Sequence, residues 1–361
     1  MIDLSNFSLP IIYLVFFTGM LLVSIAVNGL LLKFSTNLGA KNESQQTRWA
    51  STTKPAFGGV SFFIIFLSSI VFYAIFFGNN QILLNIKFLG VVIASSLGFM
   101  MGLADDAYNT KPFLKFLVQF LCAMIFIFTG NVIHTFSYEW LNITLTFIWV
   151  VGMMNSINML DNMDGITASI SMIICSGAAM VLIFNERYSD IDLILILGVI
   201  SAIGGFLYYN WNPSRMYMGD SGSQFLGTFL AAIGITYFWN SPDYFGQVIP
   251  EKQILIVALM FIVPLSDTTA VSINRILKGQ SPFVGGRDHT THHLSYMGLS
   301  DRHVAMLLIS ISVVSLGLSV LIINNIETWS ISYTLSFGVL FLLIAGSLYS
   351  TTKISKPKPK L

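Results

Sequence analysis

The sequence consists largely of long apolar runs separated by short polar segments. An α-helix needs about 20 apolar residues to cross the hydrocarbon core of a membrane. Eleven runs approach or exceed this length, and we predict a membrane-spanning helix in each. They cover residues 9–33, 57–77, 88–104, 113–133, 143–160, 166–184, 191–209, 223–240, 253–274, 303–325 and 332–350. The chain is therefore predicted to be an all-α integral membrane protein, a multi-span helical bundle.

The composition supports this prediction. Only 10% of the 361 residues are charged and 55% are hydrophobic, whereas soluble domains carry roughly 25% charged residues. We find no internal repeat and no low-complexity linker, so residues 1–361 are predicted to form a single polytopic domain. The lipid bilayer is the expected partner, and no nucleic acid is expected.

Basic residues in the connections predict the orientation, because cytoplasmic loops of membrane proteins are enriched in Lys and Arg. With the N-terminus outside, 15 of the 18 basic residues lie on the cytoplasmic side, and only Lys87, Arg187 and Lys252 lie outside. The C-terminus is then cytoplasmic. The connections on that side comprise residues 34–56, 105–112, 161–165, 210–222 and 275–302, followed by a basic tail at 351–361.

Six aspartates gather at the cytoplasmic ends of the predicted spans. They are Asp105, Asp106, Asp161, Asp164, Asp220 and Asp267. Ionisable groups at membrane depth are costly and by default indicate function. One aspartate alone could cap a helix or pair with a lysine, but a set of like charges at one face repels itself unless a cation lies between them. Because all the ligands would be oxygen atoms, the predicted cation is Mg²⁺, with Mn²⁺ as the alternative.

Residues 103–111 and 155–166 form the first two of four polar motifs. In the first, the adjacent carboxylates Asp105 and Asp106 point in different directions at a helix end, so that one can bind metal while the other faces substrate. The second places Asn158 and Asp161 three residues apart, on one helix face. Gly165 follows them, where it permits a break and lets a ligand approach the backbone.

Residues 210–223 form the third motif, in which Gly219, Gly222 and two serines surround Asp220 just before a span begins. Backbone N–H groups at the start of a helix bind phosphate well. With a metal ion bound to Asp220 beside them, a diphosphate would be held both by the metal ion and by these N–H groups.

The fourth motif, residues 281–294, carries Arg287, His289, His292 and His293 in the longest late cytoplasmic loop. Histidines at such spacing occur in zinc sites. No cysteine is near, however, and Arg287 would repel a metal ion. A basic clamp on phosphate groups is therefore the favoured interpretation, with zinc and a purely structural role as the alternatives.

These motifs, in this order and on one membrane face, are preceded by Lys-Pro-Ala-Phe-Gly-Gly at residues 54–59. Over nearly the whole chain the pattern resembles the polyprenyl-phosphate N-acetylhexosamine-1-phosphate transferases of glycosyltransferase family 4. This family includes the phospho-MurNAc-pentapeptide translocase of peptidoglycan synthesis. The number of spans and the last two motifs look like the branch that starts O-antigen or teichoic-acid lipids. That branch commonly has His-x-His-His, whereas here two residues separate His289 from His292, so Arg287 or Asp288 could share the role of His289.

The resemblance implies a reaction. A sugar-1-phosphate, by default N-acetylglucosamine-1-phosphate, would pass from a UDP-N-acetylhexosamine to undecaprenyl phosphate at the cytoplasmic face of a bacterial inner membrane. UMP would be released, and a lipid-linked cell-envelope glycan would be started. N-acetylgalactosamine and deoxy amino sugars are the alternatives for the sugar of the donor. The resemblance also makes a homodimer plausible.

The resemblance also implies roles for individual residues. Asp220 would ligate Mg²⁺, helped by Asp105 or Asp106 and by Asp161. Asn210, Asp164 and Gly165 would lie beside the uracil ring, on which Tyr217 would stack. Asp105 would orient or deprotonate the acceptor phosphate. The expected catalytic and metal-binding residues are Asp105, Asp106, Asp161 and Asp220, and the expected substrate-binding residues are Lys54, Asn158, Asp164, Gly165, Asn210, Tyr217, Arg287, His289, His292 and His293.

Three other functions fit the sequence less well. A polytopic lipid or nucleotide-sugar transporter would also be apolar, but it would be expected to pair charges near the bilayer midplane. An alcohol phosphotransferase acting on a CDP-lipid needs Ala-Arg after Asp-Gly, whereas Asp164-Gly165 is followed by Ile166 and Thr167. A membrane zinc protease is excluded because the sequence has no HExxH motif.

Overall fold

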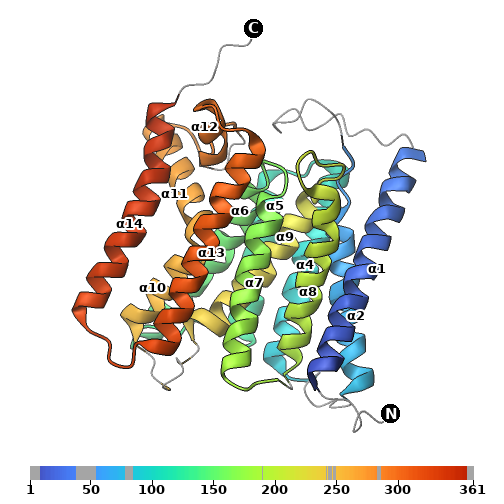
Figure 1. Ribbon diagram of the computed structural model, residues 1–361, viewed down its shortest axis with the longest axis horizontal. Coiled ribbons are helices and arrows are strands. Elements are labelled where there is room, and N and C mark those ends of the chain that lie inside the picture. Colours follow the sequence, from blue (N-terminus) through green and yellow to red (C-terminus); the bar gives the residue numbers. More distant parts are fainter. Residues whose placement is uncertain are drawn as a thin grey trace.

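The computed structural model describes residues 9–37, 54–77, 84–188, 190–240, 242, 246, 249–282 and 286–355. In this part of the chain the structure is helical, with one isolated β-bridge (Figure 1). The elements are α1 (Leu9–Asn37), α2 (Gly58–Phe76), α4 (Ile86–Tyr108), α5 (Pro112–Phe128), α6 (Glu139–Leu160), α7 (Ile166–Phe184), α8 (Ile191–Asn210), α9 (Gly219–Ile233), the π-helix η1 (Gly234–Trp239), α10 (Pro250–Met260), α11 (Ile262–Leu277), α12 (Thr290–Tyr296), α13 (Asp301–Asn325) and α14 (Ile331–Ile354).

The predicted fold class, an all-α membrane protein, is confirmed. Each predicted span coincides with a helix or with a pair of consecutive helices. Among the described residues, eight helices are long and apolar enough to cross a membrane, or nine if α10 and α11 count as one span. α5 is shorter, with 17 residues, and the predicted span at 223–240 is divided between α9 and η1. The count of eleven and the orientation stay predictions.

The predicted span at 253–274 is not one straight helix. It is divided into α10 and α11, whose axes differ by 82°. Phe261, between them, has non-helical angles of φ −103° and ψ 25°. Pro264 explains the break, because proline has no N–H to donate to the carbonyl of Met260 four residues earlier and its ring crowds that carbonyl.

Several predicted connections are shorter than expected, because helices extend into them. α1 continues to Asn37 and α14 to Ile354, so the predicted tail at 351–361 begins inside a helix. The predicted connection at 275–302 contains α12. Residues 38–53 and 356–361 of the predicted connections lie outside the described residues.

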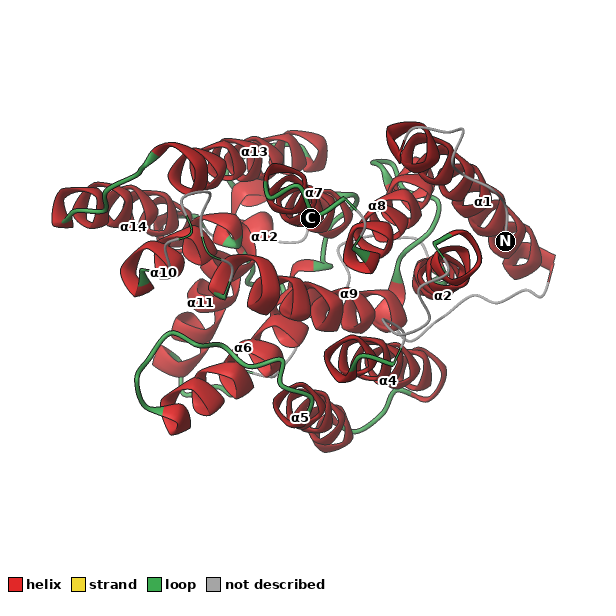
Figure 2. Ribbon diagram, turned by 90° about the horizontal axis from the view of Figure 1, so that it is seen from below, coloured by secondary structure: helices red, strands yellow, loops and turns green. Residues whose placement is uncertain are grey.

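α9 lies at the centre of the bundle and packs against α2, α4, α6 and α7 (Figure 2). Every residue of α9 except Asp220 is buried. Small residues let neighbouring backbones approach it closely. A Cβ atom on Gly102 of α4 would lie 2.1 Å from the Asp220 carbonyl oxygen, and one on Gly59 of α2 would lie 2.2 Å from the Gly222 nitrogen. The first turn of α9 is therefore held between α2 and α4.

We expect Gly102→Ala to lower the apparent melting temperature of the detergent-solubilised protein, because the added methyl group meets rigid backbone atoms of α9. Overpacking of this kind costs about 1–3 kcal/mol. Gly338→Ala in α14 is the matched control, since nothing lies within 4 Å of its added Cβ atom. Equal melting temperatures for the two variants, measured by a fluorescence thermal-shift assay, would contradict the close contact.

Candidate active site

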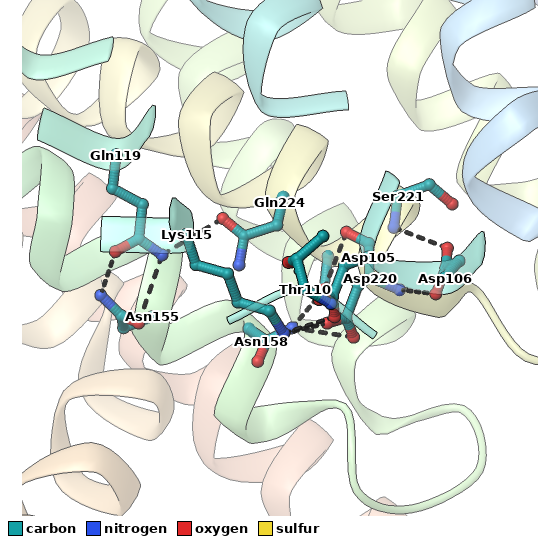
Figure 3. Close-up of polar contacts among 11 residues, drawn as sticks. Asp105, Asp106, Thr110, Lys115, Gln119, Asn155, Asn158, Asp220, Ser221 and Gln224 are labelled. Atoms are coloured by element: carbon teal, nitrogen blue, oxygen red, sulfur yellow. Dashed lines mark hydrogen bonds and ion pairs between the residues drawn. The ribbon is translucent and has the colours of Figure 1, made fainter. Parts of the chain in front are cut away.

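A carboxylate from α4 fixes the start of α9. Asp106 accepts the backbone N–H of Asp220 at 2.8 Å with Oδ1 and that of Ser221 at 2.9 Å with Oδ2 (Figure 3). The first N–H groups of a helix have no partners within the helix, and negative charge beside them is stabilising. Both oxygens of Asp106 are thus used to hold α9 and to position Asp220.

The carboxylates of Asp105 and Asp220 converge on the ammonium group of Lys115. Lys115 Nζ lies 2.9 Å from Asp220 Oδ2 and forms a second ion pair with Asp105 (Figure 3). Thr110 donates its backbone N–H and its hydroxyl to Asp105 Oδ1, at 2.8 and 2.6 Å. In the sequence, Lys115 is one of the 15 basic residues on the predicted cytoplasmic side, and no further role was predicted for it. Its position in the first turn of α5, just after the aspartate pair, could have indicated that it lies near these carboxylates.

Asn158 joins this group from α6. Its Nδ2 donates to Asp220 Oδ1 at 3.2 Å and to Ser223 Oγ at 2.8 Å. Asp161, predicted on the same helix face, is half-buried at the C-terminal cap of α6, where its N–H donates to the Asn158 carbonyl at 3.3 Å. The structure therefore brings Asp105, Asp220 and Asn158 together and places Asp161 one turn further along the chain.

A layer of amide side chains lies directly behind these residues, and of its members only Asn155 belongs to a predicted motif. Gln119 donates to Gln224 Oε1 at 3.3 Å and accepts from Asn155 Nδ2 at 2.8 Å (Figure 3). Each amide lies one helical turn from a site residue on α5, α6 or α9. Such a repeat of polar residues at helical spacing inside apolar runs was the signal that could have predicted it.

The donor set of Asp105 and Asp220 suits Mg²⁺. This ion is usually held by one or two carboxylates together with substrate phosphates and water, and the two carboxylates already face one positive charge. Within the described ranges, no group of three or more His, Cys, Asp or Glu side chains could hold a metal ion. The metal prediction therefore stays a prediction, and Asp105 and Asp220 are the pair that fits it.

Residues from three connections form a second polar cluster. Ala56 and Tyr217 pair in a parallel β-bridge, which sets Lys54 beside the segment before α9. Lys54 Nζ donates to Ser214 Oγ at 2.9 Å, lies 3.8 Å from Asp164 Oδ2 and lies 5.2 Å from the centroid of the Tyr217 ring. Asp164 also accepts the Ser214 N–H at 2.9 Å. Three of the predicted substrate-binding residues are therefore neighbours.

Gly165 and Asn210 are joined beside this cluster. The N–H of Gly165 donates to Asn210 Oδ1 at 3.0 Å, and Asn210 Nδ2 donates to the Met216 carbonyl at 2.8 Å. Gly165 has a φ of +75°, in the left-handed region that favours glycine. The predicted break at Gly165 is confirmed, because this residue is the N-terminal cap of α7.

The histidine loop folds into a short helix, α12, whose start is held by Asp267. Asp267 Oδ2 lies 2.8 Å from His289 Nδ1, and Oδ1 accepts the N–H and the hydroxyl of Thr290 at 2.8 and 2.6 Å. Asp267 and His289 are both buried. Asp267, one of the six aspartates predicted around a cation, instead organises the histidine loop.

Burial removes the expected charge of His292. This side chain is only 1% exposed, and burial lowers its pKa to about 3, so it is neutral at neutral pH and can offer one N–H donor. Burial also lowers the pKa of His293, whose Nδ1 lies 2.6 Å from Ser355 Oγ. At His292 and His293 burial therefore disfavours the positive charge of the predicted basic clamp, which stays a prediction.

Arg287 and Asp288 have different environments. Arg287 is exposed, whereas Asp288 receives two hydrogen bonds from Arg275, at 2.9 and 2.7 Å. Burial raises the pKa of Asp288, but the Arg275 guanidinium more than offsets this effect and the pKa is lowered. Both carboxylate oxygens of Asp288 therefore accept hydrogen bonds from Arg275. Residues 283–285 of the fourth motif lie outside the described residues.

The three groups of residues lie at one end of the bundle, where α4 and α6 end and α9 and α12 begin. Thr291 joins the histidine loop to the connection between α6 and α7, because its hydroxyl donates to Asn162 Oδ1 at 2.6 Å. The arrangement can hold a divalent cation, a polar ring and anionic groups side by side at a membrane face.

Comparison with known proteins agrees with this arrangement. Residues 88–238, which contain the first three polar motifs, match the family model for glycosyl transferase family 4. The chain is 27% identical to the probable undecaprenyl-phosphate N-acetylglucosaminyl 1-phosphate transferase of Bacillus subtilis, over 90% of this chain and 87% of that protein. It is 27% identical to the decaprenyl-phosphate N-acetylglucosaminephosphotransferase of Mycobacterium leprae, over 76% and 75%. It is also 27% identical to the phospho-N-acetylmuramoyl-pentapeptide-transferase of Streptococcus pneumoniae, over 72% and 79%.

The neutral state of His292 predicts a pH dependence of stability. The unfolded chain protonates this residue near its ordinary pKa of 6.5, whereas the folded protein resists protonation down to about pH 3. The unfolded state therefore binds more protons in this window, and stability is lost as the pH falls from about 6.5. Each pH unit between about 6 and 4 removes at most about 1.4 kcal/mol.

We expect His292→Gln to reduce the fall in apparent melting temperature between pH 7.5 and pH 5. His303→Gln is the control, because His303 is exposed at the start of α13. The prediction fails if the His292 variant shows the same pH dependence as the unaltered protein.

Proposed function

We propose that the chain is a member of glycosyl transferase family 4, whose family model matches residues 88–238, and that it transfers a sugar-1-phosphate from a nucleotide sugar to a polyprenyl phosphate in the membrane. The names of the relatives support this general reaction, since two of the three are N-acetylglucosamine-phosphate transferases acting on a polyprenyl phosphate. The proposed acceptor is undecaprenyl phosphate, the proposed donor is UDP-N-acetylglucosamine, and the product starts a lipid-linked cell-envelope glycan.

The location of the site supports a cytoplasmic face of a bacterial inner membrane. In the predicted topology, 15 of the 18 lysines and arginines of the sequence belong to the side that carries the aspartates. This distribution favours the cytoplasmic side, where nucleotide sugars are made.

The observation that carries the proposal is the convergence of Asp105 and Asp220 on one positive charge at a membrane face. Bound by these carboxylates, Mg²⁺ would neutralise charge on the diphosphate of the donor. Asp106 keeps Asp220 in place through the start of α9. Lys115 supplies a further positive charge with three N–H donors, which can contact phosphate oxygens.

The bond changes follow from the substrates. An oxygen of the lipid phosphate forms a bond to the sugar-proximal phosphorus, and the bond from that phosphorus to the bridging oxygen breaks, so that UMP leaves with this oxygen. A phosphate monoester has a second pKa near 6, so much of the acceptor is a dianion at neutral pH and needs no base. Asp105, held by Thr110 and Lys115, is therefore proposed to position groups, and catalysis rests on alignment and charge.

The second cluster is proposed to hold the nucleoside. The Tyr217 ring offers a flat surface for uracil, and Lys54 lies above it. Asp164 is fixed by Ser214, so its carboxylate is preorganised. Gly165 and Asn210 shape the adjoining backbone. His292 is proposed to donate a neutral hydrogen bond to the substrate, and the exposed Arg287 to contribute charge.

We expect the purified protein to release UMP from UDP-N-acetylglucosamine only when undecaprenyl phosphate and Mg²⁺ are both present. Asp220→Ala should reduce the rate by at least about 10²-fold, the scale of losing a group that stabilises transition-state charge. The measurement is a coupled UMP assay over a panel of UDP-sugars, with folding checked by thermal shift. No UMP from any donor with folded protein would overturn the proposal and favour a transporter.

Lys115→Met tests the shared positive charge separately. We expect kcat to fall about tenfold or more while the protein stays folded, because Asp105 and Asp220 would then face each other without Lys115. Lys353→Met is the control, since Lys353 lies exposed in α14 against Tyr349. Equal rates in the two variants would remove Lys115 from the mechanism.

A further inference from the structure

A cavity of about 430 Å³ lies at the opposite end of the bundle from the active site. Its walls come from the N-terminal end of α4, the turn after α5, the connection from α7 to α8 and the π-helix η1. Lys87 in this cavity precedes Asp105 by 18 residues of the same helix, which corresponds to about 27 Å along the axis. The cavity is therefore separate from the proposed reaction.

The basic residues of this end are concentrated at the cavity. Only three of the 18 lysines and arginines belong to this side of the predicted topology, and two of them, Lys87 and Arg187, line the cavity. The third, Lys252, is buried and donates to the Ile326 carbonyl at 2.9 Å. Since basic residues are disfavoured on the external side, two in one cavity call for a reason.

The two cations differ in what they contact. Arg187 Nε donates to Asp190 Oδ2 at 2.7 Å, and its guanidinium lies 5.8 Å from the centroid of the Tyr237 ring. Among the described residues, the Lys87 ammonium has no carboxylate partner. Lys87 is thus the cation available to an anionic ligand.

Carboxylates line another part of the same cavity. Asp190 is paired with Arg187, and Asp192 accepts a hydrogen bond from the Tyr237 hydroxyl of η1. A carboxylate accepts several hydrogen bonds at once, so both have capacity for a protonated amine. A π-helix often marks a functional site, and here η1 contributes Ile235 and Thr236 to the wall. The lining as a whole suits a ligand with both an anionic and a cationic group.

The surroundings identify the ligand as amphiphilic. Tyr138, Trp140 and Tyr188 are exposed at this end of the bundle, and such aromatic residues sit at the level of lipid headgroups. Leu84 and Ile86, next to the Lys87 wall, are also exposed, as expected for contact with acyl chains. We propose that this cavity binds the phosphoethanolamine headgroup of a membrane lipid, with its phosphate at Lys87 and its ammonium at Asp190 and Asp192.

Native mass spectrometry of the full-length protein tests this proposal. The protein is equilibrated in micelles that contain equal amounts of phosphatidylethanolamine, phosphatidylglycerol and phosphatidylcholine. We expect retention of phosphatidylethanolamine, because the glycerol headgroup lacks an amine and the choline group has no N–H to donate. Lys87→Gln should lower this retention about tenfold, the scale of one charge-assisted hydrogen bond, while Lys353→Gln leaves it unchanged.

Asp192→Asn tests the other half of the site. Asparagine still accepts from the Tyr237 hydroxyl but lacks the negative charge, so the preference for phosphatidylethanolamine over phosphatidylglycerol should disappear. Unaltered retention in Lys87→Gln, or equal retention of the three lipids by the unaltered protein, would overturn the proposal. Displacement of the lipid by millimolar inorganic phosphate would also overturn it, by assigning the cavity to free phosphate. Thermal shift confirms that each variant is folded, and none of these measurements depends on turnover.

Discussion

The carboxylate of Asp106 on the first turn of α9 is the interaction on which the active site depends. α9 is buried at every residue except Asp220, so the position of that carboxylate is decided by where the helix starts. Asp106 satisfies two N–H groups that have no partner in the helix. The glycines at 59 and 102 then let α2 and α4 close around the same turn. A buried core helix thereby presents one carboxylate at the membrane face.

Side chains from other segments hold two further helix starts in the same way. Asp267 holds the first residues of α12 through Thr290, and Asn210 holds Gly165 at the start of α7. In lipid, backbone groups must find partners inside the protein, so irregular backbone is tolerated at the helix ends where side chains can reach it. The polar motifs gather at one end of the bundle because several helix starts are held there by side chains from other segments.

The sequence predicted the helices and the shared face of the motifs, because apolar length and the order of the polar residues depend on local patterns. It did not predict what each aspartate does. A carboxylate can pair with a lysine, accept the N–H groups of a helix start or bind a histidine, and only tertiary contacts show which of these Asp220, Asp106 and Asp267 does. Lys115 was overlooked for the same reason. The neutral state of His292 follows from its burial, which no spacing reveals, whereas the bend at Phe261 could have been predicted from Pro264.

The charges at the centre of the site explain why so acidic a cluster suits an anionic substrate. Asp106 faces the positive end of α9, which leaves two carboxylates, Asp105 and Asp220, against one ammonium group on Lys115. This trio carries a net charge of about −1 with every group ionised and would repel a diphosphate. A divalent cation bound there would change this net charge to about +1, and oxygen ligands alone can hold such a cation. Under the proposed function, the aspartates would therefore serve to bind positive charge, and the donor phosphates would be attracted to the bound cation and not to the carboxylates.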